Sequence, residues 1–233
     1  MNTLHASDLN PRRTARVTGI LFLLTILGGI YAQAFVSNRL ISFSDAALTA
    51  NNILTHRSQF ELGLTVYLIE MACQVASVAL VYRLMRRVNG NVALVAAFIE
   101  LTGCVIKTLS RVFYITPLFL LSGTTAFGAF NPEQLRALAL VLLKINDRGA
   151  GLALAFFGVS GVLNGYLIYR STFLPRFLGI AVMIGSAGWL RFFFPSLRFP
   201  PFTVVALVAL AVAALHIFWF IVYGVDEKRW AER

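Results

Sequence analysis

The sequence predicts an all-α protein, a polytopic transmembrane bundle of about six helices. Three observations predict this class: long apolar runs, few charged residues, and basic residues placed between the runs. Of the 233 residues, 58% are hydrophobic and 13% are charged, whereas soluble domains carry about 25% charged residues. Backbone groups in hydrocarbon must hydrogen-bond to one another, so runs of this length are predicted to be helices and not strands.

Six stretches are long enough to cross about 30 Å of hydrocarbon, which takes roughly 20 helical residues. They cover residues 17–36, 62–82, 92–118, 149–169, 174–194 and 202–223. We therefore predict one membrane domain, residues 17–224, between tails at 1–16 and 225–233. The first stretch also resembles a cleavable signal peptide, because arginines precede it and Ala32-Gln33-Ala34 follows its apolar part. The apolar run is long for a signal peptide, so we favour an uncleaved first span.

Two of the predicted outer loops carry helix signals. Asp45 is placed to cap a short helix over residues 46–54. Asn131 at a cap position and Pro132 in the first turn predict a second, amphipathic helix over about 132–145. This helix is too short to span, so we expect it to lie along the outer surface and lead into the fourth span. Its apolar face would consist of Leu135, Leu138, Leu142 and Ile145.

The basic residues predict that both termini are cytoplasmic. Short cytoplasmic loops are enriched in Lys and Arg. With the N-terminus inside, the inner segments carry eleven basic residues: Arg12, Arg13, Arg16, Arg83, Arg86, Arg87, Arg170, Arg176, Lys228, Arg229 and Arg233. The outer segments carry seven: Arg39, Arg57, Arg136, Lys144, Arg148, Arg191 and Arg198. The remaining two, Lys107 and Arg111, lie inside a span.

Several classes of function find no support in the residues. The net charge of +10 comes from clusters between apolar runs, which are orientation signals and not a phosphate-binding face, so no nucleic-acid partner is predicted. Cys73 and Cys104 lie in apolar runs without ligand spacing, so no metal site is predicted. HExxH, GxSxG, P-loop and GxGxxG motifs are missing, and no catalytic residue or cofactor is assigned.

The second and third spans concentrate polar residues that are costly in hydrocarbon. A short loop makes these spans an antiparallel hairpin, so heights can be compared at about 1.5 Å per residue. Glu70 and Lys107 come at similar heights, as do Gln74 and Glu100, and Glu61 and Arg111 near the outer boundary. We predict that these faces meet inside the bundle, with Glu70–Lys107 as the central ion pair.

Other spans add candidates to this interior layer. Ser160 and Asn164 in the fourth span and His216 in the sixth project to heights near that of Glu100. His216 could shuttle protons to a carboxylate, or it could be a satisfied interior group. Glycines 158, 161 and 165 predict a tight helix-packing seam. The candidate ligand- or ion-binding residues are Glu70, Gln74, Glu100, Lys107, Arg111, Asn164 and His216.

Several short segments together resemble a known family. They are Arg13 to Gly19, Tyr67 to Glu70, Ala79 to Leu84, Phe98 to Glu100, Phe156 to Gly158, Gly165 to Ser171 and Leu174 to Gly179. In this order they resemble a bacterial membrane-protein family catalogued as domain of unknown function 4386. The resemblance covers residue 12 to the last span. It implies a bacterial inner-membrane protein with an uncleaved first span, and it carries over no substrate, cofactor or catalytic residue.

The sequence leaves three functions open. The first is a membrane transport or binding protein, whose interior polar layer binds a small ligand or ion or relays protons. The second is a membrane scaffold or sensor subunit, in which the same charges only hold helices together. The third is an intramembrane enzyme acting on a lipid or quinone. In each case the lipid bilayer is the predicted surrounding partner.

Overall fold

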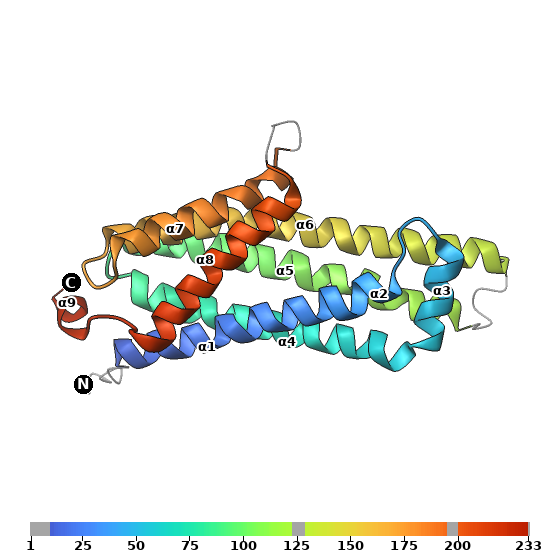
Figure 1. Ribbon diagram of the computed structural model, residues 1–233, viewed down its shortest axis with the longest axis horizontal. Helices are drawn as coiled ribbons and strands as arrows, with labels where there is room; N and C mark the ends of the chain where they lie inside the picture. Colours follow the sequence, from blue (N-terminus) through green and yellow to red (C-terminus); the bar gives the residue numbers. More distant parts are fainter. Residues whose placement is uncertain (1–9, 123–128, 195–199, 233) are drawn as a thin grey trace, which may run out of the picture. The chain divides into compact units, whose positions relative to one another are not determined.

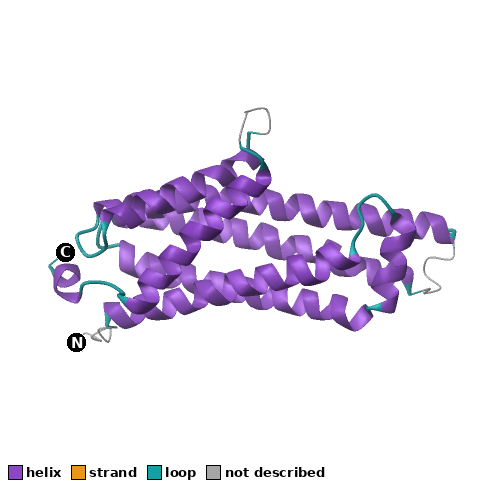
Figure 2. Ribbon diagram, viewed as in Figure 1, coloured by secondary structure: helices purple, strands orange, loops and turns teal. Residues whose placement is uncertain are grey.

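The computed structural model describes residues 10–122, 129–194 and 200–232, and within these ranges every regular element is a helix (Figures 1 and 2). The predicted all-α class is confirmed. Arg198, Arg233 and residues 1–9 of the predicted N-terminal tail lie outside the described residues. In chain order the elements are α1 (Pro11–Ile30), the π-helix η1 (Tyr31–Ser37), α2 (Asn38–Leu40), α3 (Ala46–Thr55), α4 (Arg57–Met85), α5 (Gly90–Leu121), α6 (Pro132–Arg170), α7 (Arg176–Ala187), the 3-10 helix η3 (Gly188–Phe192), α8 (Phe202–Val222) and α9 (Glu227–Ala231).

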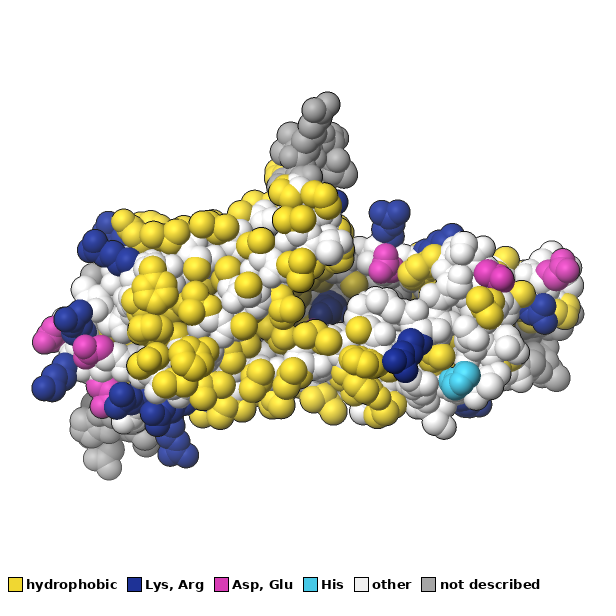
Figure 3. All heavy atoms as spheres, in the orientation of Figure 1, with side chains coloured by type: hydrophobic (Ala, Val, Ile, Leu, Met, Phe, Trp, Pro, Cys, Tyr) yellow, Lys and Arg dark blue, Asp and Glu magenta, His cyan; other side chains and the backbone are white. Residues whose placement is uncertain are grey.

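Five helical runs in the described residues are long and apolar enough to cross a membrane. They are Pro11–Leu40, Arg57–Met85, Gly90–Leu121, Pro132–Arg170 and Phe202–Val222. Many large apolar side chains on them face outward; Phe98 is 63% exposed and Leu207 is 62% exposed. Figure 3 shows hydrophobic side chains spread over α7 and α8 on the face drawn. Outward apolar side chains on long apolar helices indicate a lipid environment, and the chain is a membrane protein.

The predicted span at 174–194 differs from the other five. It consists of α7, with 12 residues, and η3, with 5 residues, and it falls short of the length of the other runs. The backbone changes from α-helix to the tighter 3-10 helix at Gly188. Gly188 packs closely on α8, since an added Cβ there would lie 2.6 Å from a methyl carbon of Val205. At about 1.5 Å per α-helical and 2.0 Å per 3-10 residue, the two pieces still rise about 28 Å.

The predicted outer helix at about 132–145 is not a separate element. It is the first part of α6, which runs unbroken for 39 residues. The expected cap is present: the backbone N–H groups of Asn131 and Gln134 each donate to the other's side-chain oxygen at 2.9 Å. The packed face also differs, because Ala139 and Leu143 are buried whereas Leu138 and Ile145 are exposed. In lipid, apolar side chains such as Leu138 and Ile145 can point outward, so hydropathy alone does not show which face of the helix packs on the protein.

The chain divides into two compact units. Unit 1 contains residues 1–23, 75–101 and 155–233, and unit 2 contains residues 24–74 and 102–154. Helices α1, α4, α5 and α6 contribute residues to both units.

In unit 1 the start of α1 and the end of α8 lie together. Arg12 Nε donates to the Tyr223 carbonyl at 3.3 Å, and Arg16 Nη2 to the Val222 carbonyl at 3.4 Å. The Asp226 N–H donates to the carbonyl of Phe173, just before α7, at 3.2 Å. Thus α7 leaves this end of unit 1 and α8 returns to it. Figure 3, in the orientation of Figure 1, shows Lys and Arg side chains gathered near α9 and the start of α1.

The predicted glycine seam packs α6 against α7 within unit 1. A Cβ on Gly165 would lie 2.8 Å from the Gly179 carbonyl oxygen, and one on Gly158 would lie 2.9 Å from the Ser186 carbonyl oxygen. Real Cβ atoms essentially never come so close, so these helices touch through their backbones. The seam is therefore a packing contact inside the chain, as predicted.

Unit 2 has an aromatic centre. The rings of Phe60 in α4 and Tyr114 in α5 stack with centroids 4.2 Å apart. Gly63 makes room for them, because a Cβ there would lie 2.8 Å from the Tyr114 hydroxyl. Asp45 caps α3 as predicted, its carboxylate accepting the Leu48 N–H at 2.8 Å. The Phe60–Tyr114 stack and the close approach at Gly63 bring α4 and α5 together.

Candidate functional site

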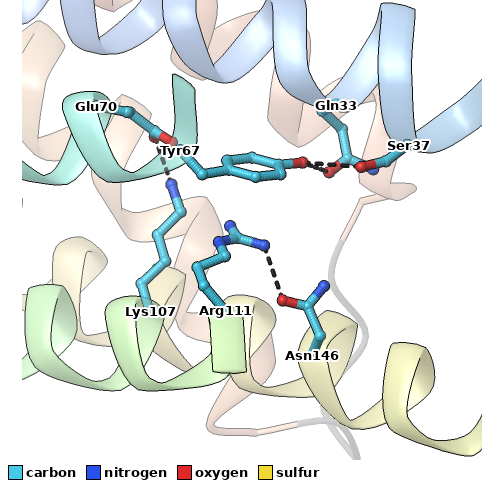
Figure 4. Close-up of polar contacts among 7 residues, drawn as sticks. All are labelled: Gln33, Ser37, Tyr67, Glu70, Lys107, Arg111 and Asn146. Atoms are coloured by element: carbon cyan, nitrogen blue, oxygen red, sulfur yellow. Dashed lines mark hydrogen bonds and ion pairs between the residues drawn. The ribbon is translucent and has the colours of Figure 1, made fainter. Parts of the chain in front are cut away.

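The predicted ion pair between Glu70 and Lys107 is present. Lys107 Nζ of α5 lies 2.5 Å from Glu70 Oε1 of α4, and the Glu70 side chain is only 5% exposed (Figure 4). Gly29 of α1 lies against the same carboxylate, since a Cβ there would lie 3.2 Å from Glu70 Oε1. Two charges thus leave water together, and each compensates the other's desolvation.

Arg111, one turn beyond Lys107 on α5, is 4% exposed. The sequence placed it at a height similar to that of Glu61, but these two residues form no ion pair. Glu61 instead accepts from Arg57 on its own helix at 2.9 Å, in an exposed pair. Arg111 Nη1 donates to Asn146 Oδ1 of α6 at 2.9 Å, and its guanidinium carbon lies 3.6 Å from the centroid of the Tyr67 ring. Matching heights indicated similar depth, but they could not indicate which way each side chain turns.

The Tyr67 hydroxyl is held from the other side by η1. It donates to Gln33 Oε1 at 2.9 Å and lies 3.1 Å from Ser37 Oγ. Gln33 and Ser37 lie four residues apart within the π-helix, whose wider turn brings both to one hydroxyl. π-Helical turns occur frequently at functional sites. We call the following set the polar cluster: Gln33, Ser37, Tyr67, Glu70, Lys107, Arg111 and Asn146 (Figure 4).

Four members of the polar cluster were not among the candidates predicted from the sequence: Gln33, Ser37, Tyr67 and Asn146. Gln33 and Ser37 appear in the sequence as polar residues at the end of an apolar run, and Asn146 lies between the predicted outer helix at about 132–145 and the predicted span at 149–169. The four-residue spacing of Gln33 and Ser37, which places both on one face of a helix, was the available signal. Gln74, the remaining unit 2 candidate, is buried on α4 one turn beyond Glu70.

Two buried polar atoms of the cluster have no hydrogen-bond partner among the described residues. They are Glu70 Oε2 and Arg111 Nε. An unmade hydrogen bond on a buried charged group is costly, and more so in low-dielectric surroundings. The charges are also unequal, because two cations, Lys107 and Arg111, share one buried carboxylate. Asp147 is exposed and makes no ion pair with Arg111 within 4.0 Å.

The remaining candidates lie in unit 1, where Glu100 meets Ser160 and Asn164 as predicted. Ser160 Oγ lies 2.8 Å from Glu100 Oε2 and 2.9 Å from the Ala96 carbonyl. Asn164 Nδ2 donates to Glu100 Oε2 at 3.4 Å. This carboxylate of α5 is thereby tied to α6 by neutral donors.

His216 packs against aromatic rings, with its centroid 5.5 Å from that of Phe22 and 4.2 Å from that of Phe220. Within the described part of the chain no carboxylate forms an ion pair with it, and its Nε2 has no hydrogen-bond partner. No group of three His, Cys, Asp or Glu residues suited to a metal occurs in the described residues.

Comparison with known proteins defines the family. A family model described as domain of unknown function DUF4386 matches residues 17–224. The chain belongs to the DUF4386 family. An uncharacterized protein of Archaeoglobus fulgidus is 33% identical to this DUF4386 chain over 89 residues, which are 36% of the chain and 54% of that relative. The match thus spans about half the length of the relative. No solved structure matches.

Proposed function

We propose that this DUF4386 protein is a membrane transport or binding protein whose polar cluster in unit 2 binds a small polar solute. The observation that supports this is the pair of unpartnered buried atoms, Glu70 Oε2 and Arg111 Nε, in a cluster whose other contacts are well formed. A solute with a donor for one atom and an acceptor for the other would satisfy both.

The competing scaffold function accounts less well for these atoms. Charges that only join helices gain most when every donor and acceptor is paired, because a half-satisfied polar network is worse than an apolar interior. Here the cluster joins α4 to α5 through Glu70–Lys107 and α5 to α6 through Arg111–Asn146. It nevertheless retains one acceptor, Glu70 Oε2, and one donor, Arg111 Nε, without a partner among the residues that the structure describes, which is the pattern of a site that completes its contacts with a solute.

The proposal predicts solute-dependent stabilisation of the purified protein. Thermal unfolding in detergent would be followed with Na⁺, K⁺, small carboxylic acids, amino acids, primary amines and neutral sugars. A solute that binds the folded state at a hundred times its Kd stabilises it by about 2.7 kcal/mol. We expect one of these classes to raise the unfolding midpoint of the wild type and to have little effect on Glu70→Gln.

Glu61→Gln is the matched control, since it removes an exposed glutamate from the same helix. It should respond as the wild type does. If none of the classes raises the midpoint, the scaffold function replaces the proposed one. A full response of Glu70→Gln would show that the solute does not contact Glu70 Oε2, one of the two atoms on which the proposal rests.

We also propose that both termini face the cytoplasm in a bacterial inner membrane. Arg12, Arg16 and the α9 segment lie at one end of unit 1, with Arg87 over the Trp230 ring at 3.7 Å. Basic residues at one end agree with the inside bias of Lys and Arg. A C-terminal green fluorescent protein fusion is expected to fluoresce, and a C-terminal alkaline phosphatase fusion to be inactive. The reverse pair of results would invert the topology.

A further inference from the structure

We propose that the solute carries a single carboxylate, which binds to the Nε–Nη2 edge of Arg111. This inference rests on the proposed function and names the chemistry of its ligand. Three observations support it: how the guanidinium is held, which edge is unused, and the local charge.

The guanidinium of Arg111 is held on one face and at one nitrogen. The Tyr67 ring lies against its face at 3.6 Å, and Asn146 accepts from Nη1 at 2.9 Å. Tyr67 is itself fixed by Gln33 and Ser37 of η1. Because its partners are anchored on α4, α6 and η1, the group is oriented before a ligand arrives, as Figure 4 shows.

The unused part of the group is the edge that contains Nε. In a guanidinium, Nε and Nη2 point the same way and form a fork that matches the two oxygens of a carboxylate. Nη1 is committed to Asn146, and Nε has no partner among the described residues although it is buried. A carboxylate on this edge would complete the hydrogen bonding of Nε.

The local charge favours a monoanion. Lys107 and Arg111 contribute two positive charges and Glu70 one negative charge, so these groups sum to +1. An uncompensated buried cation is unfavourable, and one negative charge neutralises it. A doubly charged phosphate would leave an excess of −1, and a cation would raise the charge to +2.

Glu70 Oε2 adds a preference among carboxylates. It is buried, without a partner among the described residues, and can only accept a hydrogen bond while Glu70 is ionised. A hydroxyl group on the same solute would donate to it without adding charge. This favours a water-soluble hydroxy acid over a fatty acid, which lacks the donor, and over an amino acid, whose ammonium group would restore the excess positive charge.

The test compares carboxylic acids with the corresponding amides, in which an uncharged amide replaces the carboxylate, on the purified full chain in detergent. The probes are lactate and lactamide, glycine and glycinamide, and octanoate and octanamide, with the midpoint of thermal unfolding as the readout. We expect lactate to raise the midpoint, glycine, a zwitterion without net charge, to raise it less, and the amides to leave it unchanged. A response to octanoate alone would support the carboxylate contact and place its source in the membrane.

Two variants assign the contact to Arg111. Arg111→Lys keeps the charge but loses the fork, and is expected to weaken the apparent affinity for the responding acid at least about tenfold. Arg136→Lys, an exposed arginine in α6, should bind as the wild type. Asn146→Asp places a carboxylate beside Arg111 within the protein. It should raise the midpoint of the empty protein and abolish its response to the acid.

Three results would overturn the inference: equal responses to acids and amides, no response to any acid, or unchanged acid binding in both Arg111→Lys and Asn146→Asp. If an amine, a sugar or an alkali cation acts through Glu70 instead, the proposed function stands and the carboxylate inference fails. If none of the solute classes acts, both fail.

Discussion

Replacing Lys107 with Met is expected to destabilise the fold by about 3–5 kcal/mol, the usual cost of removing one partner from a buried ion pair. The loss is large because Glu70, 5% exposed, would keep its charge or take up a proton without the cation 2.5 Å away. The free energy of unfolding would be measured by denaturant titration in mixed micelles. The double variant Glu70→Gln/Lys107→Met, which leaves no lone charge of this pair, is expected to recover most of the loss.

The exposed pair Arg57–Glu61 provides the control for this prediction. It has the same kind of charges at 2.9 Å, with side chains 61% and 46% exposed. Exposed ion pairs contribute about 0–1 kcal/mol, so Arg57→Met should change stability little. Equal losses at the two positions, or no recovery in the double variant, would show that Glu70 and Lys107 do not stabilise each other.

Replacing Gly179 with Ala is expected to cost about 2–3 kcal/mol, and replacing it with Leu to prevent folding. A Cβ at this position would lie 2.5 Å from the backbone nitrogen of Tyr169 and 2.6 Å from the Gly165 carbonyl oxygen. Both neighbours are backbone atoms of α6 and cannot move aside as a side-chain end can, so α6 and α7 must separate. Folding yield and thermal midpoint in detergent would measure the effect.

Gly90→Ala is the matched control, because no atom lies within 4 Å of a Cβ at that position. It begins α5, where alanine favours the helix over glycine by up to about 1 kcal/mol. We therefore expect no loss of stability. A Gly179→Ala protein as stable as Gly90→Ala would mean that the contact between α6 and α7 is looser than the structure has it.

Much of the candidate site could be predicted because hydrocarbon penalises isolated charges. From this constraint and their similar heights we predicted the ion pair between Glu70 and Lys107. The same reasoning placed Ser160 and Asn164 at the height of Glu100. The same reasoning failed for Arg111 and Glu61. Glu61 is 46% exposed and has a partner four residues away on its own helix, so it did not need Arg111.

The helical boundaries show a similar division. Long apolar runs predicted five of the membrane-crossing helices, and local signals at Asp45 and Asn131 correctly predicted two helix starts. We did not predict that the helix starting after Asn131 continues to residue 170. No local signal near residue 146 shows whether one helix ends there and another begins, or whether a single helix continues. In the structure Gly149 of α6 packs against Ser110 of α5, a contact between distant parts of the chain that local sequence signals do not show.

The sequence by itself determined the helical class, the membrane setting, the height of each charged residue along its helix and one ion pair, because these follow from hydropathy and from 1.5 Å per residue along a helix. Only the tertiary structure decided that Tyr67, Asn146, Gln33 and Ser37 surround Arg111, and that Glu70 Oε2 and Arg111 Nε are left without partners among the described residues. The physical reason is rotation: height along a helix follows from residue number, whereas the direction a side chain faces depends on how neighbouring helices pack around it.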